Sequence, residues 1–354
     1  MSRVWVLTNE YEPFIIGGLG TVATHLSNTL ARTGLQVTII TRNPQNKIAV
    51  SSKGTITVIR FPAKFPAAKI AAYMQKNNIQ RPRIIHIHSL EYADLANLYR
   101  KKWNIPYVYT LHSIVRSNVS KIHRQSIQKK LLKSAKTVVV PSTQEYKRLI
   151  NIYPFCKRKT KVIAHGVKLR KSSKRVRSDR LLFAGRLIRE KGILELIDAM
   201  KLLKRVRPSV KLFIIGDGDP RYIRKLKLRV KKHKLQQHIY WLGFYKQSAL
   251  LSAYQRYGAV VMPSKTESFG LVALEALANG IPLVSTRAGG LSMFVNSKVA
   301  QVIPRVKAEA IAKAIQAMWN HPKRTDQRVL AGKKLAANYT WTKAAKRYVK
   351  IFKL

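Results

Sequence analysis

Short apolar runs alternate with longer helical stretches through the first half of the chain, which is the pattern of a doubly wound parallel sheet. The apolar runs predict strands at Arg3–Thr8, Gln36–Thr41, Ile56–Phe61, Arg83–His88, Tyr107–Leu111, Thr137–Val140 and Lys161–Ala164. The segments between them predict helices near Gly20–Arg32, Ala67–Lys76, Tyr92–Lys101, His123–Ser134 and Gln144–Ile150. We therefore expect one α/β domain at residues 1–168.

The alternation stops at a polar, non-periodic stretch and then restarts. The second half predicts strands at Leu181–Ala184, Lys211–Ile215, Ile239–Leu242, Ala259–Met262, Pro282–Ser285 and Gln301–Ile303. It predicts helices near Ile193–Arg205, Arg221–Lys232, Lys246–Gln255, Leu271–Asn279, Ala308–Trp319, Lys323–Asn338 and Thr342–Lys353. We expect a basic linker at 169–180, a second α/β domain at 181–338 and a C-terminal helix at 339–354. A chain of 354 residues is long enough for two such domains.

The chain is organised around one strand, loop and helix of the second domain. The strand predicted at Ala259–Met262 is ended by a proline, and the following helix is expected to end with Gly280 as its C-cap. Glu267 falls in the intervening loop, at the carboxyl edge of a parallel sheet, where open α/β folds bind ligands. Glu275 falls about two turns into the helix. The helix N-terminus offers free amides, which suit an anion.

This pair of glutamates has a structural alternative, in which Glu267 caps the helix and Glu275 lies on a solvated face. Composition bears on the choice. The chain holds only 15 acidic residues against 68 basic ones, so each carboxylate that is present is less readily explained as an ordinary surface residue.

Two other loops between a strand and a helix carry groups that suit a phosphate. Gly17, Gly18 and Gly20 follow the first strand, where glycines let the backbone approach a ligand and free helix amides for an anion. A flexible loop in which glycine merely caps the helix is an equally favoured explanation of these glycines. Arg186 and Lys191 follow the strand that opens the second domain and form a cationic clamp for a diphosphate, although such pairs arise easily in a chain this basic.

The bulk composition narrows the class of protein. No segment has the roughly 18 consecutive apolar residues of a spanning helix, and no secretory leader is evident. The single cysteine, Cys156, excludes an internal disulfide and a thiolate metal cluster. These features fit a cytoplasmic protein. The formal charge of +53 predicts salt-dependent attraction to polyanions such as nucleic acid, anionic lipid or anionic glycan.

The Glu267–Glu275 stretch, with its Ser-Phe-Gly-Leu and Gly-Ile-Pro segments, resembles the Glu-x7-Glu signature of retaining nucleotide-sugar glycosyltransferases. That family, which includes glycogen and sucrose synthases and phosphatidylinositol mannosyltransferases, has the GT-B architecture. The resemblance covers essentially the whole chain and is densest at 181–290. It implies two Rossmann-like domains facing a cleft, with a C-terminal helix that crosses back to the first domain. It also implies a donor that is a nucleoside-diphosphate sugar and a reaction that needs no metal ion or other cofactor.

The resemblance also implies roles for individual residues. Glu267 would hold the hydroxyls of the donor sugar, and Glu275 those of the ribose. Arg186 and Lys191 match the Gly-Arg-x4-Lys-Gly motif, whose two cations neutralise the leaving diphosphate. His112, after the fifth predicted strand, would support the sugar near the reacting centre, although a lone histidine at a strand end is usually structural.

Further donor contacts are implied by the same resemblance. They would come from Gly17, Gly18 and Gly20 of the first domain and from Gly216, Trp241, Ser268, Phe269, Gly270 and Leu271 of the second. Trp241 has the alternative of packing in the core, and Asp219 is expected to cap the helix after Gly216. His86 and His88 more readily pack, with His88 the nearer of the two to the expected cleft.

Some positions depart from the family pattern. Met293 stands where relatives often have an acidic residue, and His165 stands where many have Asn in Asn-Gly-Val-Asp. These departures weaken any inference about the identity of the donor.

The basic charge suggests two hypotheses. The first is a glycosyltransferase that docks on an anionic surface, with a membrane lipid or cell-envelope glycan as acceptor, at the inner face of the cell membrane. The second is a polyanion- or membrane-binding protein that kept the fold and lost the chemistry; non-specific nucleic-acid binding is possible in either case. A basic segment of the first domain could lie on a bilayer with its apolar side chains down, or be a solvated helix face over the core. Its residues are Lys121, Ile122, Arg124, Ile127, Lys129, Lys130, Leu131, Leu132, Lys133 and Lys136.

Overall fold

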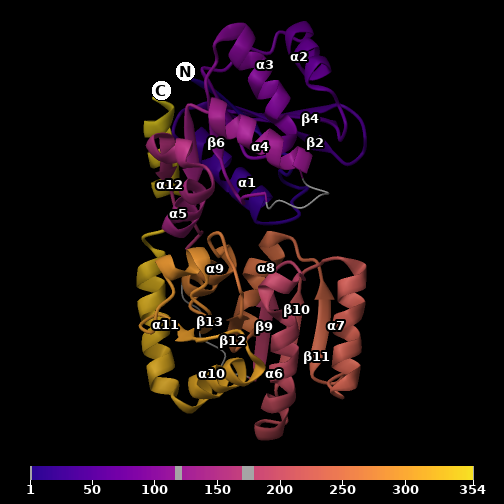
Figure 1. The fold of residues 1–354 in the computed structure, drawn as a ribbon, viewed down its shortest axis with the longest axis vertical. Coiled ribbons are helices and arrows are strands. Elements are labelled where there is room, and N and C mark those ends of the chain that lie inside the picture. The colour runs from indigo at the N-terminus through magenta and orange to yellow at the C-terminus, as the bar shows by residue number, and fades with distance from the viewer. Residues whose placement is uncertain (1, 116–121, 170–178, 354) are drawn as a thin grey trace. The chain divides into compact units, whose positions relative to one another are not determined.

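The computed structural model describes residues 2–115, 122–169 and 179–353 (Figure 1). The chain divides into two compact units. The N-terminal unit comprises Met1–Gly166 together with Trp341–Leu354, and the C-terminal unit comprises Val167–Thr340. The expected linker, 169–180, lies almost wholly outside the described residues; its last residue, Arg180, begins a strand of the C-terminal unit.

The N-terminal unit is built on a sheet with the strand order β3-β4-β2-β1-β5-β6-β7-β8. The strands are β1 (Arg3–Leu7), β2 (Gln36–Asn43), β3 (Ala49–Lys53), β4 (Ile56–Pro62), β5 (Ile84–Ile87), β6 (Tyr107–Thr110), β7 (Thr137–Val140) and β8 (Thr160–Val162). Every pairing is parallel except that of β3 with β4. The edge strand β3 was not predicted, because its mostly polar side chains are exposed and form no apolar run.

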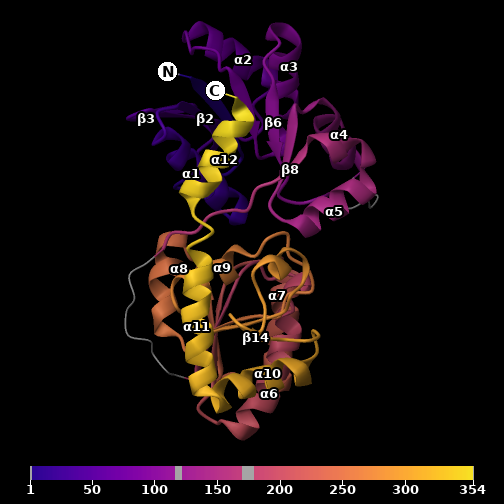
Figure 2. The same cartoon turned by 90° about the vertical axis from the view of Figure 1, so that its left-hand side faces the viewer.

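Helices cover both faces of this sheet. They are α1 (Gly18–Ala31), α2 (Ala67–Lys76), α3 (Ala93–Trp103), α4 (Ile122–Ser134), α5 (Thr143–Ile152) and α12 (Trp341–Phe352). One face carries the main apolar core, to which Trp5, Ile85 and Tyr107 contribute. The C-terminal helix α12 packs beside α1 (Figure 2), and its Tyr348 hydroxyl lies 2.8 Å from Thr110 Oγ1 of β6. The last helix is thus an integral part of the N-terminal unit.

The C-terminal unit has a parallel sheet with the order β11-β10-β9-β12-β13-β14. The strands are β9 (Arg180–Ala184), β10 (Lys211–Ile215), β11 (Ile239–Gly243), β12 (Ala259–Met262), β13 (Leu283–Ser285) and β14 (Gln301–Val302). The helices are α6 (Ile193–Val206), α7 (Pro220–Lys232), α8 (Gln247–Ala253), α9 (Leu271–Ala278), α10 (Ala308–Asn320) and α11 (Pro322–Ala336). The predicted α/β class with two Rossmann-like parallel sheets is confirmed.

Two expectations about local structure need correction. The basic segment that includes α4 offers little apolar surface to a bilayer, because Leu131 and Leu132 are fully buried in the core and Ile127 packs against it, which leaves Ile122 as its exposed apolar side chain. The exposed cations of α4 therefore form a solvated helix face; Lys136 is exposed beyond the end of the helix, and Lys121 lies outside the described residues. In α9, Asn279 is the C-cap and Gly280 follows it with φ +69°.

The structure also bears on membrane association. Among the described residues, no helix combines the length and apolar character needed to cross a membrane.

Candidate active site

The central loop of the C-terminal unit is held on both sides by neighbouring backbone. The loop runs from the end of β12 to the start of α9 and places Glu267 between them. The Glu267 carbonyl accepts the amide of Gly290 at 2.8 Å, and the Lys265 amide donates to the Glu190 carbonyl at 2.8 Å. Thr286 Oγ1 donates to the Ser264 carbonyl at 2.7 Å. The position of Glu267 is therefore fixed by contacts remote in sequence.

The Glu267 carboxylate forms an ion pair with Lys191. Oε1 accepts from Lys191 Nζ and, at 3.3 Å, from Ser264 Oγ. Both side chains are largely shielded, with 18% of Lys191 and 10% of Glu267 exposed. A shielded pair is screened less by salt than a surface pair, so this contact keeps a carboxylate and an ammonium group together at the carboxyl end of the sheet.

The loop that carries Lys191 is pressed against the Glu267 loop at Gly192. Gly192 adopts φ +68°, and a Cβ there would lie 2.0 Å from the Pro263 carbonyl oxygen, so a larger residue would push the loops apart. Arg186, in the same loop, is exposed and has no ion-pair partner among the described residues. Of the two cations of the predicted clamp, Lys191 is thus already paired with Glu267, whereas Arg186 has no such partner among the described residues.

Glu275 is buried, which contradicts the alternative of a solvated helix face. Its side chain accepts from Tyr254 Oη at 2.8 Å and from Gln247 Nε2 at 2.9 Å. Burial raises the pKa of this carboxyl, while the hydrogen bonds from Gln247 and Tyr254 lower it. A buried carboxylate with several donors suits the recognition of hydroxyl groups. Sequence reasoning missed Tyr254 and Gln247, which no local motif links to Glu275.

The residues around the N-terminus of α9 differ in which atoms are accessible. Phe269 is buried against Phe294 and Tyr339, so its ring is not accessible to a ligand. Gly270 is the N-cap, while Ser268 and Leu271 are half-buried beside it. These positions together present the helix terminus that the sequence predicts.

The two remaining donor candidates of this unit follow or lie in neighbouring strands. Gly216 comes directly after β10, and its amide donates to the Gly243 carbonyl at 2.8 Å. Trp241 lies within β11 and packs against the core cluster, as its structural alternative expects. Asp219 caps α7 by accepting the amides of Arg221 at 2.9 Å and Tyr222 at 3.1 Å, as predicted.

In the N-terminal unit, the glycine loop is organised by a carboxylate. Gly17 is the N-cap of α1, and its amide and that of Ile16 donate to Glu10 Oε2 at 2.9 Å each. At Gly20 a Cβ would lie 2.8 Å from both Cβ and Oε2 of Glu10. Gly18, the first helical residue, is exposed. The sequence indicated the glycines but not the role of Glu10.

His112 lies just beyond β6 in a group of imidazoles. Its Nε2 is 2.9 Å from His88 Nδ1, and its ring centroid is 5.9 Å from that of His165. Burial lowers the pKa of His112 to about 4. His86, two residues before His88, forms a hydrogen bond of 2.7 Å between its Nε2 and Thr110 Oγ1. The clustering of His88 and His165 with His112 was missed, although all three follow the carboxyl ends of strands.

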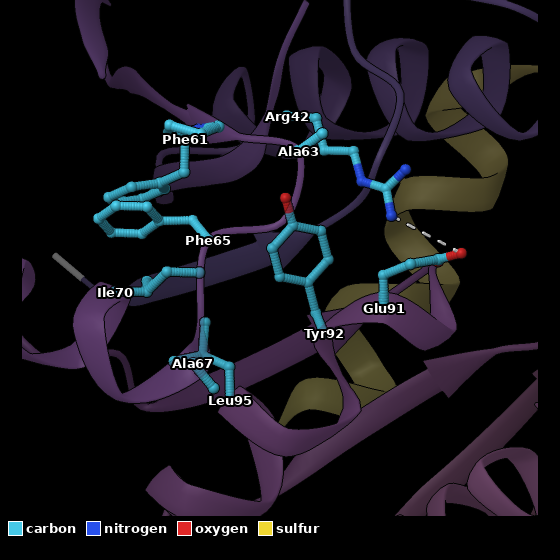
Figure 3. A pocket seen from close by; sticks show the side chains of 10 residues that line it. Arg42, Phe61, Ala63, Phe65, Ala67, Ile70, Glu91, Tyr92 and Leu95 are labelled. Atoms are coloured by element: carbon cyan, nitrogen blue, oxygen red, sulfur yellow. Dashed lines mark ion pairs between the residues drawn. The ribbon is translucent and has the colours of Figure 1, made fainter. Parts of the chain in front are cut away.

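A small hollow with a cavity volume of about 30 Å³ lies at the carboxyl ends of β2 and β4 (Figure 3). Phe61, Phe65 and Tyr92 line it with apolar surface. Arg42 and Glu91 form its polar side, 3.9 Å apart (Figure 3). A cavity of this volume has room for ordered water but is far smaller than the roughly 300 Å³ of a small-molecule pocket.

The described residues contain no group of three or more His, Cys, Asp or Glu side chains arranged to hold a metal ion. What the C-terminal unit does hold is a buried carboxylate with hydroxyl and amide partners, a lysine–glutamate pair, a free guanidinium and a helix N-terminus. This set can bind a molecule that combines hydroxyls with phosphates.

Comparison with known proteins assigns the chain. The family model described as Glycosyl transferases group 1 matches residues 167–335, and Glycosyltransferase Family 4 matches residues 16–171. Glycogen synthase of Mycobacterium tuberculosis (strain CDC 1551 / Oshkosh) is 25% identical, over 99% of this chain and 94% of that protein. The alpha-monoglucosyldiacylglycerol synthase of Acholeplasma laidlawii is 25% identical, over 80% of this chain and 79% of that protein.

The fold agrees with this assignment. The structure of Anabaena HepE in complex with UDP-glucose superposes with a TM-score of 0.81 at 19% identity, and the match covers 100% of both chains. The chain therefore belongs to the glycosyltransferases of the GT-B fold, with a group 1 domain in its C-terminal half and a family 4 domain in its N-terminal half.

Proposed function

We propose that this glycosyltransferase moves a sugar from a nucleoside-diphosphate donor to an acceptor with retention at the anomeric carbon and without a metal ion. The observation that carries the proposal is the pair of carboxylates in one strand-loop-helix segment. Glu275 is buried with hydroxyl and amide partners, and Glu267 is paired with Lys191. Glu275 would hold the ribose hydroxyls and Glu267 those of the sugar.

In this proposal the leaving diphosphate is stabilised electrostatically. Arg186 and Lys191 supply positive charge, and the amides near Gly18 and at Phe269 to Leu271 supply hydrogen-bond donors. Preorganised cations and dipoles offset the charge that develops on the diphosphate as the glycosidic bond breaks, which is the role a metal ion would otherwise fill. His112 supports the sugar near the anomeric carbon.

We assign the acceptor to the membrane lipids or cell-envelope glycans. The formal charge of +53 favours an anionic surface, and the relative from Acholeplasma laidlawii is named as a synthase of a glycosylated diacylglycerol. Docking would be electrostatic, since the exposed cations of α4 and α7 lie on solvated faces.

The first experiment incubates the protein with UDP-, GDP- and ADP-sugars, with and without vesicles of anionic phospholipid, and measures release of nucleoside diphosphate. Release from one donor identifies that half of the reaction, and stimulation by vesicles indicates a lipid acceptor. The anomeric configuration of the product, read by NMR, tests retention. Activity that survives EDTA supports metal independence, and loss that Mg²⁺ restores contradicts it.

The second hypothesis, a binding protein without chemistry, rests on the charge alone. The variant Glu267→Gln distinguishes the enzyme hypothesis from the binding-protein hypothesis. The enzyme hypothesis expects loss of transfer with vesicle binding unchanged, because one charge in a basic surface of this size is minor. Tight, salt-sensitive vesicle binding without release from any donor would favour the binding protein.

A further inference from the structure

We infer that His88 is a positioning residue that fixes the tautomer of His112, so that Nε2 of His112 accepts a hydrogen bond and Nδ1–H is presented as a donor. The inference rests on the proposed function in one respect: His112 is taken to contact an oxygen of the bound sugar. The hydrogen bond itself belongs to the N-terminal unit alone and can be tested without activity.

The two imidazoles are held at fixed places by the sheet. His88 follows β5 and His112 follows β6, and these strands are parallel neighbours. His88 is 3% exposed, and its ring lies tilted against that of His86 with ring centroids 4.2 Å apart. The contact between His88 Nδ1 and His112 Nε2, at 2.9 Å, has the length of a good hydrogen bond. Neither ring can turn without losing it.

Both imidazoles are neutral near pH 7. Burial lowers the pKa of His112 to about 4 and lowers that of His88 well below its usual value, with His86, His112 and His165 as the further causes for His88. In a neutral pair, one of the two facing nitrogens carries hydrogen and the other accepts it.

The remaining nitrogen of His88 decides which way the bond runs. His88 Nε2 is buried and has no hydrogen-bond partner among the described residues. If His112 donated, His88 would have to carry its hydrogen on this Nε2, as a buried N–H without an acceptor. Orphaned buried N–H groups are rarer than orphaned acceptors. The favoured arrangement therefore puts the hydrogen on His88 Nδ1, which donates to His112 Nε2.

This arrangement defines what His112 offers to a substrate. Its Nδ1 carries hydrogen and has no partner among the described residues, while the side chain is only partly exposed. His112 is then a hydrogen-bond donor for a hydroxyl or phosphate oxygen, and not a general base. A positioned donor of this kind acts only if its tautomer is fixed, which is what His88 supplies.

The test compares His88→Ala with His88→Asn. Alanine removes the partner of His112, whereas asparagine can place an amide N–H near the position of Nδ1. The direct measurement is the ¹⁵N spectrum of the histidine rings at pH 7.5. We expect His112 in the wild-type protein to be protonated at Nδ1 and bare at Nε2, and to populate both tautomers in His88→Ala. A wild-type His112 protonated at Nε2 would overturn the assignment.

Steady-state kinetics test whether His88 contributes to the transfer reaction. We expect His88→Ala to lower kcat/KM by about 10- to 100-fold, mainly through kcat, and His88→Asn to recover most of this loss. His123→Ala, an exposed histidine of α4, is the matched control and should change neither spectrum nor rate. If His88→Ala folds, changes the His112 spectrum and leaves kcat/KM unaltered, His88 has no positioning role.

The outcomes separate this inference from the proposed function. Absence of transfer by the wild-type protein with every donor sinks the proposed function, while the ¹⁵N spectrum still decides the tautomer. If His88→Ala does not fold, the spectrum of the wild-type protein and the rate of His88→Asn carry the test. A His88→Asn protein that folds, keeps Nδ1–H on His112 and yet loses activity as fully as His112→Ala would overturn the inference.

Discussion

The carboxylate of Glu10 accepts a hydrogen bond from the backbone amide of Gly17 at 2.9 Å, at the N-terminus of α1. The same oxygen accepts the amide of Ile16, and the Glu10 side chain lies so close to Gly20 that a Cβ would clash with it. A carboxylate at a helix N-terminus is stabilised by the free amides and the helix dipole. Among the described residues Glu10 forms no ion pair, although the chain is strongly basic. The glycine loop is thus shaped by an internal anion before any donor arrives.

We predict that Glu10→Ala raises the KM for the donor and lowers kcat/KM by about tenfold or more. The substitution removes two hydrogen bonds to a charged acceptor, each worth about 1.5–3 kcal/mol, so the loop loses its fixed conformation. Glu10→Gln should stay within a few-fold of the wild type, because its amide oxygen can accept both N–H groups. Steady-state kinetics over a range of donor concentrations measures the effect. Equal damage by both substitutions would instead assign the negative charge itself a role.

A second prediction concerns the buried carboxylate of the C-terminal unit. Tyr254→Phe leaves one oxygen of Glu275 without its hydroxyl partner. An unsatisfied buried acceptor costs about 1–3 kcal/mol, so the free energy of unfolding of this unit should fall by that amount. Chemical denaturation of the wild type and the variant measures it.

The same variant should also respond more to the donor. In our proposal the ribose hydroxyls donate to Glu275, so a bound nucleotide supplies the missing hydrogen bond. We expect the nucleoside diphosphate of the active donor to raise the melting temperature of Tyr254→Phe by more than that of the wild type. Equal increases would argue that Glu275 does not contact the nucleotide.

A third prediction treats Lys191 and Glu267 as one unit. Because the side chains are paired, Lys191→Ala or Glu267→Ala alone leaves a shielded charge without its partner. We expect each to lower kcat/KM by about 10²–10³-fold, the loss typical of removing one preorganised electrostatic group. The double variant should lose little more than either single one, because the residues act together. Fully additive losses would show that the two side chains act independently.

The fold could be predicted from sequence where burial leaves an apolar run. Strands β10 and β12 begin and end at the predicted residues, because each is buried and is followed by glycine or proline. The edge strand β3 could not be found, since its exposed side chains carry no such pattern. The C-terminal helix was expected from its composition, whereas its packing beside α1 depends on tertiary contacts.

Some residues of the candidate site could likewise be predicted from local sequence, whereas others depend on the fold. Glu267, Lys191 and the glycine loop were indicated because each stands at a fixed distance from a strand end. The partners of Glu275 are 21 and 28 residues away in sequence and meet it only through the fold. The stacking of His88, His112 and His165 likewise needs the order of strands in the sheet, which the sequence alone does not fix.

The imidazole group predicts how the N-terminal unit responds to acid. Burial lowers the pKa of His86 to about 3 and of His112 to about 4, and lowers those of His88 and His165 well below the usual value. In the unfolded chain these groups bind protons below about pH 6.5. Unfolding therefore takes up protons, and stability that is complete above pH 6.5 is lost as the pH falls toward 4.

We expect the melting temperature of the N-terminal unit to be several degrees lower at pH 5 than at pH 7.5. Each pH unit by which a histidine's pKa is lower in the folded than in the unfolded state contributes up to about 1.4 kcal/mol to the free energy of unfolding. His86→Phe removes one buried titrating group, so its melting temperature should depend less on pH, even if it is lower at pH 7.5 through loss of the bond to Thr110. His123→Gln, at an exposed position, should keep the wild-type dependence. Calorimetry at a series of pH values measures the three slopes. An unchanged slope in His86→Phe would mean that its imidazole titrates alike in the folded and unfolded states, against the burial that the structure gives it.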